Sequence, residues 1–352
     1  MVEVAGSLTI PAKHLNCSRI AMRIARIIAS TILLCVSLLA DASDLRQVGM
    51  INLPGPPGFG ELAFADGMLL LAHTGAAAVD VFDPARRRVV AQITGLQSPR
   101  AVAADDQAGK VYVADHGSNS IAVVSTDGWK VVDSIALSGS PDALLLDGAG
   151  KLYWSDAANG SVSLLDLRTK QNMATVDVGG AVRDLAFDGT RHLVFATVQD
   201  LHQVVALDPQ LKIVNRFEVN GSQPTGLVYD PQYQELYVSV RSAVLAINPD
   251  TGAEASRVTA PAGVDALWLD PDSGTLYAAS EGSLLVIAAK GHLAALDNIN
   301  TEVKGHTVAY DPAKRLVLVP GGREGKSKLQ IFRPMTPAVQ PGASPDTEAS
   351  VK

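Results

Sequence analysis

Four carboxylate residues stand at matching points of a pattern that recurs along the chain, each directly before a short apolar run: Glu61, Asp142, Asp184 and Asp265. Carboxylates that converge on a narrow space repel one another, so they need protons, arginine partners, water or a cation. Oxygen ligands suit a hard cation such as calcium, and a histidine among them would also admit zinc. These residues are therefore candidate metal ligands. The alternative is a hydrated space in which Arg100 pairs with Glu61 or Asp142.

Two histidines are candidate bases, because imidazole titrates near neutral pH. His306 precedes an apolar run, as the four carboxylates do, and His73 follows one. Other polar residues occupy the same two kinds of position, either before a first apolar run or in the loop after a second one. They form a candidate ligand-binding face: Arg100, Asp115, His116, Asn119, Asp156, Asn159 and Thr225.

Complete catalytic motifs are missing from the sequence. It contains no G-x-S-x-G, no H-E-x-x-H and no C-x-x-C-H. The stretch GGREGKS, from Gly321 to Ser327, resembles a phosphate-binding loop, but Pro320 stands where the first glycine of that motif belongs. We therefore expect a ligand-binding face and leave enzymatic activity open.

The elements that must position these residues repeat seven times. The second strand of each unit reads LLLAH, VYVAD, LYWSD, LVFAT, LYVSV, LYAAS or LVLVP, and successive copies lie 40 to 43 residues apart. An apolar first strand, usually ending in Asp, precedes each copy, and a third and a more alternating fourth strand follow. A period of this length is typical of propeller blades, and alternation marks the outer, half-solvated strand. We predict an all-β fold, a seven-bladed β-propeller.

The last unit has no fourth strand of its own, because its third strand, Leu329 to Phe332, runs directly into Pro334. The strand-like segment 46–53 can supply the missing strand, which would close the ring and cover an exposed sheet edge. We therefore predict one propeller domain over residues 43–334. In this fold, the loops that enter the innermost strands and those that join second to third strands open on one face, where the candidate residues would gather.

The segment VYVADHGSNSIAVVS, Val111 to Ser125, resembles both the NHL repeat and the YVTN propeller repeat, and LYWSD resembles the YWTD signature of receptor propellers. The resemblance covers Leu45 to Pro334, and seven units favour the YVTN-like or lactonase-like type over the six-bladed YWTD type. Pro141-Asp142-Ala143 and Glu61 are similar to segments where gluconolactonase-like propellers supply metal ligands. This similarity implies a metal-dependent lactone hydrolase, although those enzymes have six blades and a glycine where Ala143 stands.

The first 42 residues have the order of a secretory signal peptide. Positive charge at Arg23 and Arg26 precedes an uncharged run from Ile27 to Ala40, and Ala40-Asp41-Ala42 fits a cleavage site. Residues 1–21 form an extension upstream of this signal. Both cysteines lie in the segment that would be removed. At the other end, residues 335–352 are rich in Pro, Ala, Ser and Thr and are expected to form a disordered tail.

The formal net charge is −7, and it becomes −9 without residues 1–42, which carry four basic and two acidic side chains. This balance excludes nucleic acid as an expected partner. No membrane span is expected in the mature chain, which we place in the periplasm or outside the cell. We predict an exported YVTN-like propeller that binds a small molecule or an envelope protein through its acidic face. The alternative is a metal-dependent lactonase.

Overall fold

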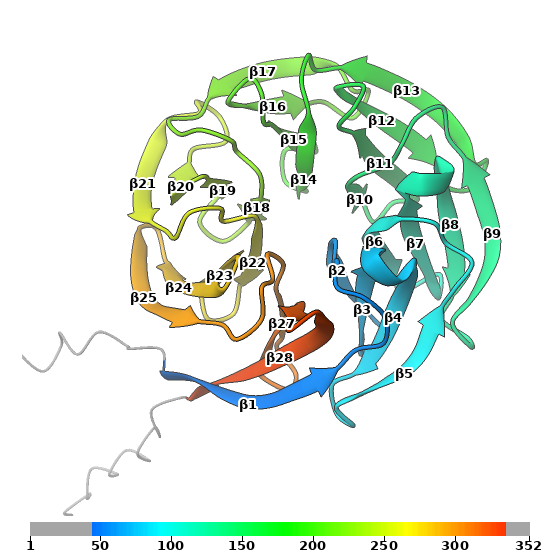
Figure 1. Cartoon of the computed structure of the whole chain (residues 1–352). Helices are drawn as coiled ribbons and strands as arrows, with labels where there is room; N and C mark the ends of the chain where they lie inside the picture. The colour runs from blue at the N-terminus through cyan, green and yellow to red at the C-terminus, as the bar shows by residue number, and fades with distance from the viewer. Residues whose placement is uncertain (1–43, 336–352) are drawn as a thin grey trace, which may run out of the picture. The chain divides into compact units, whose positions relative to one another are not determined.

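The computed structural model describes residues 44–335, which form seven four-stranded antiparallel sheets around a central axis (Figure 1). This arrangement confirms the predicted all-β, seven-bladed propeller. Six blades follow chain order from the axis outwards. The predicted signal segment 1–42 and nearly all of the predicted tail lie outside the described residues.

The first three blades take their strands from residues 62–177. Blade 1 contains β2 (Leu62–Ala65), β3 (Met68–His73), β4 (Ala78–Asp83) and β5 (Arg88–Ile93). Blade 2 contains β6 (Pro99–Asp105), β7 (Lys110–Asp115), β8 (Ser120–Ser125) and β9 (Lys130–Ala136). Blade 3 contains β10 (Leu144–Leu146), β11 (Lys151–Asp156), β12 (Ser161–Asp166) and β13 (Gln171–Asp177). Two short 3-10 helices, η1 (Thr74–Ala76) and η2 (His116–Ser118), join second to third strands in blades 1 and 2.

The next three blades repeat the same order. Blade 4 contains β14 (Val182–Asp188), β15 (Leu193–Val198), β16 (Gln203–Leu207) and β17 (Ile213–Glu218). Blade 5 contains β18 (Leu227–Asp230), β19 (Glu235–Val240), β20 (Ala243–Ile247) and β21 (Glu254–Thr259). Blade 6 contains β22 (Ala266–Asp270), β23 (Thr275–Ser280), β24 (Ser283–Ala289) and β25 (Leu293–Asn300).

Blade 7 is built from both ends of the described chain. Its inner strands are β26 (Ala309–Asp311), β27 (Leu316–Arg323) and β28 (Lys326–Met335), and its outermost strand is β1 (Asp44–Asn52). β1 pairs antiparallel with β28 from Asp44 opposite Met335 to Asn52 opposite Lys328 (Figure 1). This pairing removes an open sheet edge, as predicted. β28 ends three residues later than the predicted third strand, and Met335 is therefore part of the sheet and not of the tail.

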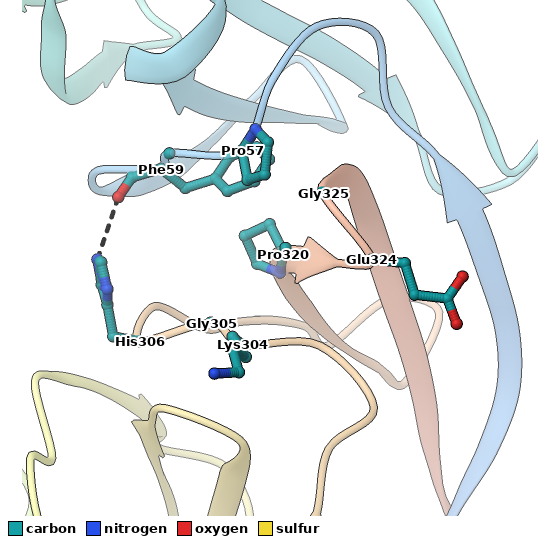
Figure 2. Close-up of a pocket in the computed structure, with 10 residues that line it drawn as sticks. Pro57, Phe59, Lys304, Gly305, His306, Pro320, Glu324 and Gly325 are labelled. Carbon is teal, nitrogen blue, oxygen red and sulfur yellow. Dashed lines mark hydrogen bonds between the residues drawn. The ribbon is translucent and has the colours of Figure 1, made fainter.

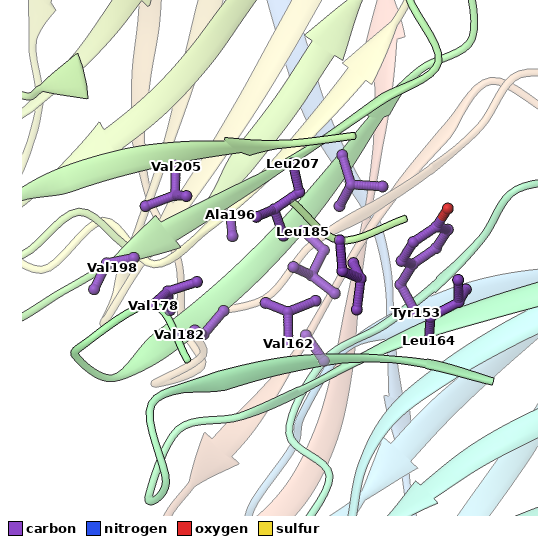
Figure 3. Close-up of a cluster of buried hydrophobic side chains, with 13 residues drawn as sticks. Tyr153, Val162, Leu164, Val178, Val182, Leu185, Ala196, Val198, Val205 and Leu207 are labelled. Carbon is purple, nitrogen blue, oxygen red and sulfur yellow. The ribbon is translucent and has the colours of Figure 1, made fainter. Parts of the chain in front are cut away.

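Apolar side chains between neighbouring blades form the core. Second strands are almost fully buried, as in β3 and β7, whereas fourth strands such as β9 alternate with exposed positions. Figure 3 shows one such layer, in which Tyr153, Val162 and Leu164 of blade 3 face Ala196 and Val205 of blade 4. Because each blade buries its two apolar faces only against its neighbours, the ring is the smallest unit that hides them all.

Helix is limited to the two 3-10 turns within residues 44–335. None of the helices in this part of the chain is long or apolar enough to cross a membrane.

Candidate functional site

A cavity of about 390 Å³ opens at one mouth of the central channel. Seven residues at the starts of the inner strands line it, each just before its strand or within the first three residues of it, one from each blade: Glu61, Arg100, Asp142, Asp184, Thr225, Asp265 and His306. They meet because every inner strand starts at this face and runs towards the opposite one. The repeat register alone therefore brings together residues that are up to 245 positions apart in the sequence.

Hydrogen bonds donated by main-chain amides across blade boundaries hold this ring of residues in place. The amide of Glu61 donates to the carbonyl oxygen of Arg100 at 2.8 Å, which joins blades 1 and 2. The Leu227 amide donates to Asp184 Oδ2 at 2.8 Å, which joins blades 4 and 5. One of these bonds joins backbone to backbone, and the other joins a backbone amide to a carboxylate that lines the cavity.

The carboxyl groups of Glu61, Asp184 and Asp265 have raised pKa values. Burial raises the pKa of Glu61 well above its usual range, and the charges of Asp184, Asp142 and Asp265 raise it further. Burial also raises the pKa of Asp184 to about 7, against the lowering effect of hydrogen bonds from the Leu227 and Leu185 amides. Near neutral pH the Asp184 carboxyl group is therefore partly protonated and can both donate and accept hydrogen bonds.

Asp265 and His306 form a more open pair at the rim. Burial raises the pKa of Asp265, while His306 and Arg183 oppose that shift. His306 Nε2 lies 4.0 Å from Asp265 Oδ2, and the two side chains are 50% and 44% exposed. His306 Nε2 also lies 3.2 Å from the carbonyl oxygen of Phe59, as Figure 2 shows. Of the two predicted bases, His306 is the one that a ligand in this cavity can reach.

The expected pairing of Arg100 with Glu61 or Asp142 does not occur. Within residues 44–335 the exposed Arg100 guanidinium has no hydrogen-bond or ion-pair partner, so it stands at the rim with its charge uncompensated. Asp142 is engaged elsewhere: its Oδ2 accepts the Ala157 amide at 3.0 Å, and its Oδ1 lies 3.3 Å from His116 Nδ1. His116 Nδ1 is buried and its contact with Asp142 lacks hydrogen-bond geometry.

His73 is not a base at the cavity, and this expectation is corrected. Its side chain is fully buried and its ring stacks on Phe59 at 4.2 Å. Nδ1 lies 2.7 Å from Asp80 Oδ2, and Nε2 lies 2.9 Å from the carbonyl oxygen of Pro56. Nε2 also lies 3.2 Å from Ser327 Oγ, so both ring nitrogens have hydrogen-bond partners. His73 joins blade 1 to the segment that follows β1.

Two predicted ligand-binding aspartates are likewise internal, with 3% of Asp115 and 1% of Asp156 exposed. The Asp115 carboxylate accepts the amides of Gln97 and Ser98, and Asp156 Oδ2 accepts the amide of Ser140. Each carboxylate thus binds the loop that connects the preceding blade to its own blade. We therefore correct the expectation that Asp115 and Asp156 present their carboxylates to a ligand.

The predicted amides serve those same loops. Asn119 Oδ1 accepts the Ser140 hydroxyl at 2.6 Å, and Asn159 Nδ2 donates to Asp156 at 2.7 Å. The remaining predicted residue, Thr225, does line the cavity, where its hydroxyl donates to the carbonyl oxygen of Gln223.

The carboxylates of the ring do not assemble into a metal site. Across residues 44–335, no three His, Cys, Asp or Glu side chains come close enough to hold one ion together. The arrangement therefore does not fit the metal that the gluconolactonase-like resemblance implies, and we derive no metal-dependent step from it.

Sequence reasoning missed two contributors to the cavity. Arg183 lines it beside Asp184 and is exposed, and Phe59 contributes an apolar wall. A side cavity of about 460 Å³ continues from Phe59 and His306 towards Lys304 and Pro320 (Figure 2). Arg183 could have been found from its position directly before a ring residue. The segment around Phe59 precedes the first repeat and follows no repeat pattern.

Comparison with known proteins identifies the fold alone. No family profile and no curated protein sequence matches the chain. A chain in the crystal structure of a mitotic checkpoint complex is similar, with a TM-score of 0.72 and 13% identity over 95% of this chain and 98% of that one. A chain of Kuenenia stuttgartiensis hydrazine synthase has a TM-score of 0.67 and 13% identity, over 82% and 97%.

Proposed function

We propose that this chain is an exported propeller that binds a small charged molecule at the channel mouth. The observation that carries the proposal is the convergence of seven residues, one from each blade, on a single cavity of about 390 Å³. That volume lies in the range of small-molecule sites. Export rests on the signal-like order of residues 1–42. A segment of an envelope protein is the other occupant that the sequence suggests.

The signs of the charges in the wall indicate the kind of ligand. Carboxyl groups of Glu61, Asp184 and Asp265 favour a cationic group, and the exposed guanidinium groups of Arg100 and Arg183 favour an anionic one. A molecule that carries both charges can satisfy both parts of the wall, whereas a molecule with one charge leaves the other part unpaired. We therefore expect a zwitterion to bind more tightly than a simple amine or a simple acid.

Thermal unfolding of the chain from Ser43 with three probes of similar length tests this proposal. 6-Aminohexanoate should raise the melting temperature saturably and by more than pentylamine or hexanoate do, because a ligand that binds only the folded state stabilises it by mass action. Asp265→Asn and Arg100→Gln should each weaken the effect. Asp127→Asn, which changes an exposed aspartate in a distant turn, is the matched control.

Two results would overturn the proposal. One is the absence of a saturable shift with all three probes. The other is a shift with 6-aminohexanoate that Asp265→Asn and Arg100→Gln leave as large as Asp127→Asn does. The first would direct attention to a protein partner, and the second to a binding site elsewhere on the ring.

A further inference from the structure

A second cavity, of about 400 Å³, lies on the face opposite the channel mouth. It is formed by the turns that join first to second strands in blades 1, 6 and 7. Its apolar lining comes from Phe64, Trp268, Leu269, Pro271, Tyr310 and Pro312. Inner strands start at the channel mouth, so their far ends carry this cavity, and the two sites are separated by the height of the ring.

Aromatic side chains from three blades form the walls of this second cavity. Phe64 of blade 1 and Trp268 of blade 6 meet edge to face, with ring centroids 5.9 Å apart and planes at 84°. The two rings contact each other although blade 7 lies between their blades in the ring. The fully buried Ala309 of blade 7 belongs to the same apolar cluster. Tyr310 of blade 7 packs against Tyr277 at 5.3 Å and is held in place from behind. The corner between Phe64 and Trp268 therefore has a fixed shape.

Carboxylates outnumber cations in this lining. Asp270, Asp272 and Asp311 contribute to it, and Lys314 is the single basic residue among the described residues that line it. Asp270 is satisfied by the Ser273 hydroxyl at 2.6 Å and the Asp272 amide at 3.3 Å. The cavity therefore combines aromatic walls with a negative charge.

Asp311 is the unusual member of this group. It is 4% exposed, and its Oδ1 accepts the Lys314 amide at 3.1 Å. Its Oδ2 is buried without a hydrogen-bond partner, and the Lys314 ammonium lies 3.5 Å away without forming a hydrogen bond. A buried carboxylate oxygen that lacks a hydrogen bond is costly. The lysine is partly exposed and can turn away to make room for another cation.

We propose that this cavity binds an organic cation, an alkylated ammonium with an apolar body. Aromatic faces attract such ions through their quadrupoles, and a desolvated carboxylate supplies the counter-charge. The apolar walls match alkyl groups and exclude hydrated metal ions. Lys314 would occupy the position of the ligand's charge in the empty cavity. This site is independent of the one proposed at the channel mouth.

Binding of choline and of its neutral isostere, 3,3-dimethylbutan-1-ol, to the chain from Ser43 tests the proposal. Tryptophan fluorescence can follow it, because Trp268 is one of only three tryptophans. Choline should bind saturably and about tenfold more tightly than the isostere. Asp311→Asn should weaken choline binding about tenfold, and Lys314→Met should strengthen it. Asp265→Asn at the channel mouth should leave the affinity for choline unchanged. A failure of this proposal can therefore be distinguished from a failure of the function proposed for the channel mouth.

Three results would each overturn the proposal. Equal affinity for choline and the isostere would show an apolar pocket without selectivity for charge. Absence of saturable binding would show no site for this class of ligand. Unchanged choline affinity in Lys314→Met would show that the lysine does not compete for the position beside Asp311. That variant alters a partly exposed residue, so the test does not depend on whether Asp311→Asn folds.

Discussion

Replacement of His73 by alanine should destabilise the ring strongly, because it removes one of the two hydrogen-bond partners of the buried Asp80 carboxylate. Asp80 would retain only the Gln92 side chain, which donates to its Oδ1 at 2.7 Å. The Pro56 carbonyl oxygen would lose its 2.9 Å contact with Nε2, and Phe59 would lose the ring on which it stacks. A buried carboxylate that loses the partner of its charge costs about 3–5 kcal/mol. We expect a loss of this size in the free energy of unfolding.

Urea unfolding, followed by tryptophan fluorescence and by circular dichroism, measures this loss. Coincident transitions would justify a two-state treatment, and an unchanged slope would assign the shift in midpoint to stability. Asp80→Asn keeps the volume of the side chain and removes its charge, so it should cost about 1–3 kcal/mol. In the double variant His73→Gln with Asp80→Asn, two neutral amides can pair with each other. Its loss should be smaller than the sum of the losses measured for His73→Gln alone and Asp80→Asn alone.

A small effect would refute this reasoning. If His73→Ala lowered the free energy of unfolding by less than about 1 kcal/mol, the buried contact between His73 and Asp80 would not stabilise the ring as described. Additive losses in the double variant would also count against it, since two groups that interact directly should show coupling. Either result would return His73 to the set of candidate functional residues.

Two further predictions concern the channel mouth and the loops around it. The native pKa of Asp184, about 7, lies above its unfolded value, so the folded state binds the extra proton and stability falls as pH rises from about 4 to about 7. Asp184→Asn should flatten this slope in pH-dependent urea titrations, and an unchanged slope would contradict the assignment. Gly139→Ala should cost about 1–3 kcal/mol, because the added Cβ would overlap Asp156 Oδ2 and displace its bond to the Ser140 amide. Gly189→Ala, where the new atom makes only ordinary contact, is the control, and equal melting temperatures for the two variants would contradict the argument.

The sequence predicts the ring well because the signal is repeated. Tyrosines occupy the same position of the second strand in four blades, at Tyr112, Tyr153, Tyr237 and Tyr277. A strand that is hard to assign in one blade can therefore be assigned from its position in the others. Closure by β1 was predictable because a missing strand at one end matched a spare strand at the other. The residues of the channel mouth followed from this register, since position in the repeat determines which end of the ring a residue occupies.

The roles of individual polar residues were less predictable. His73, Asp115 and Asp156 all end a second strand, and sequence reasoning placed them in exposed loops. The structure buries them, because that position faces the loop from the preceding blade and binds its polar groups. Such contacts join residues of different blades, so the spacing of residues within one repeat does not predict them. The same holds for the meeting of Phe64 with Trp268 across blade 7.

The closure of blade 7 by β1 also determines the order in which the ring can be completed. β1 is the first strand of the described chain to be synthesised, and its partner β28 is the last, so the pair joins nearly the two ends of that chain. Contacts between residues so distant in sequence form slowly, because a long loop must close before they contribute. During this interval β1 and β28 both have an unpaired edge, and such edges promote association between chains. Refolding yield should therefore fall with protein concentration, and a circular permutant that connects β1 directly to β28 should refold faster.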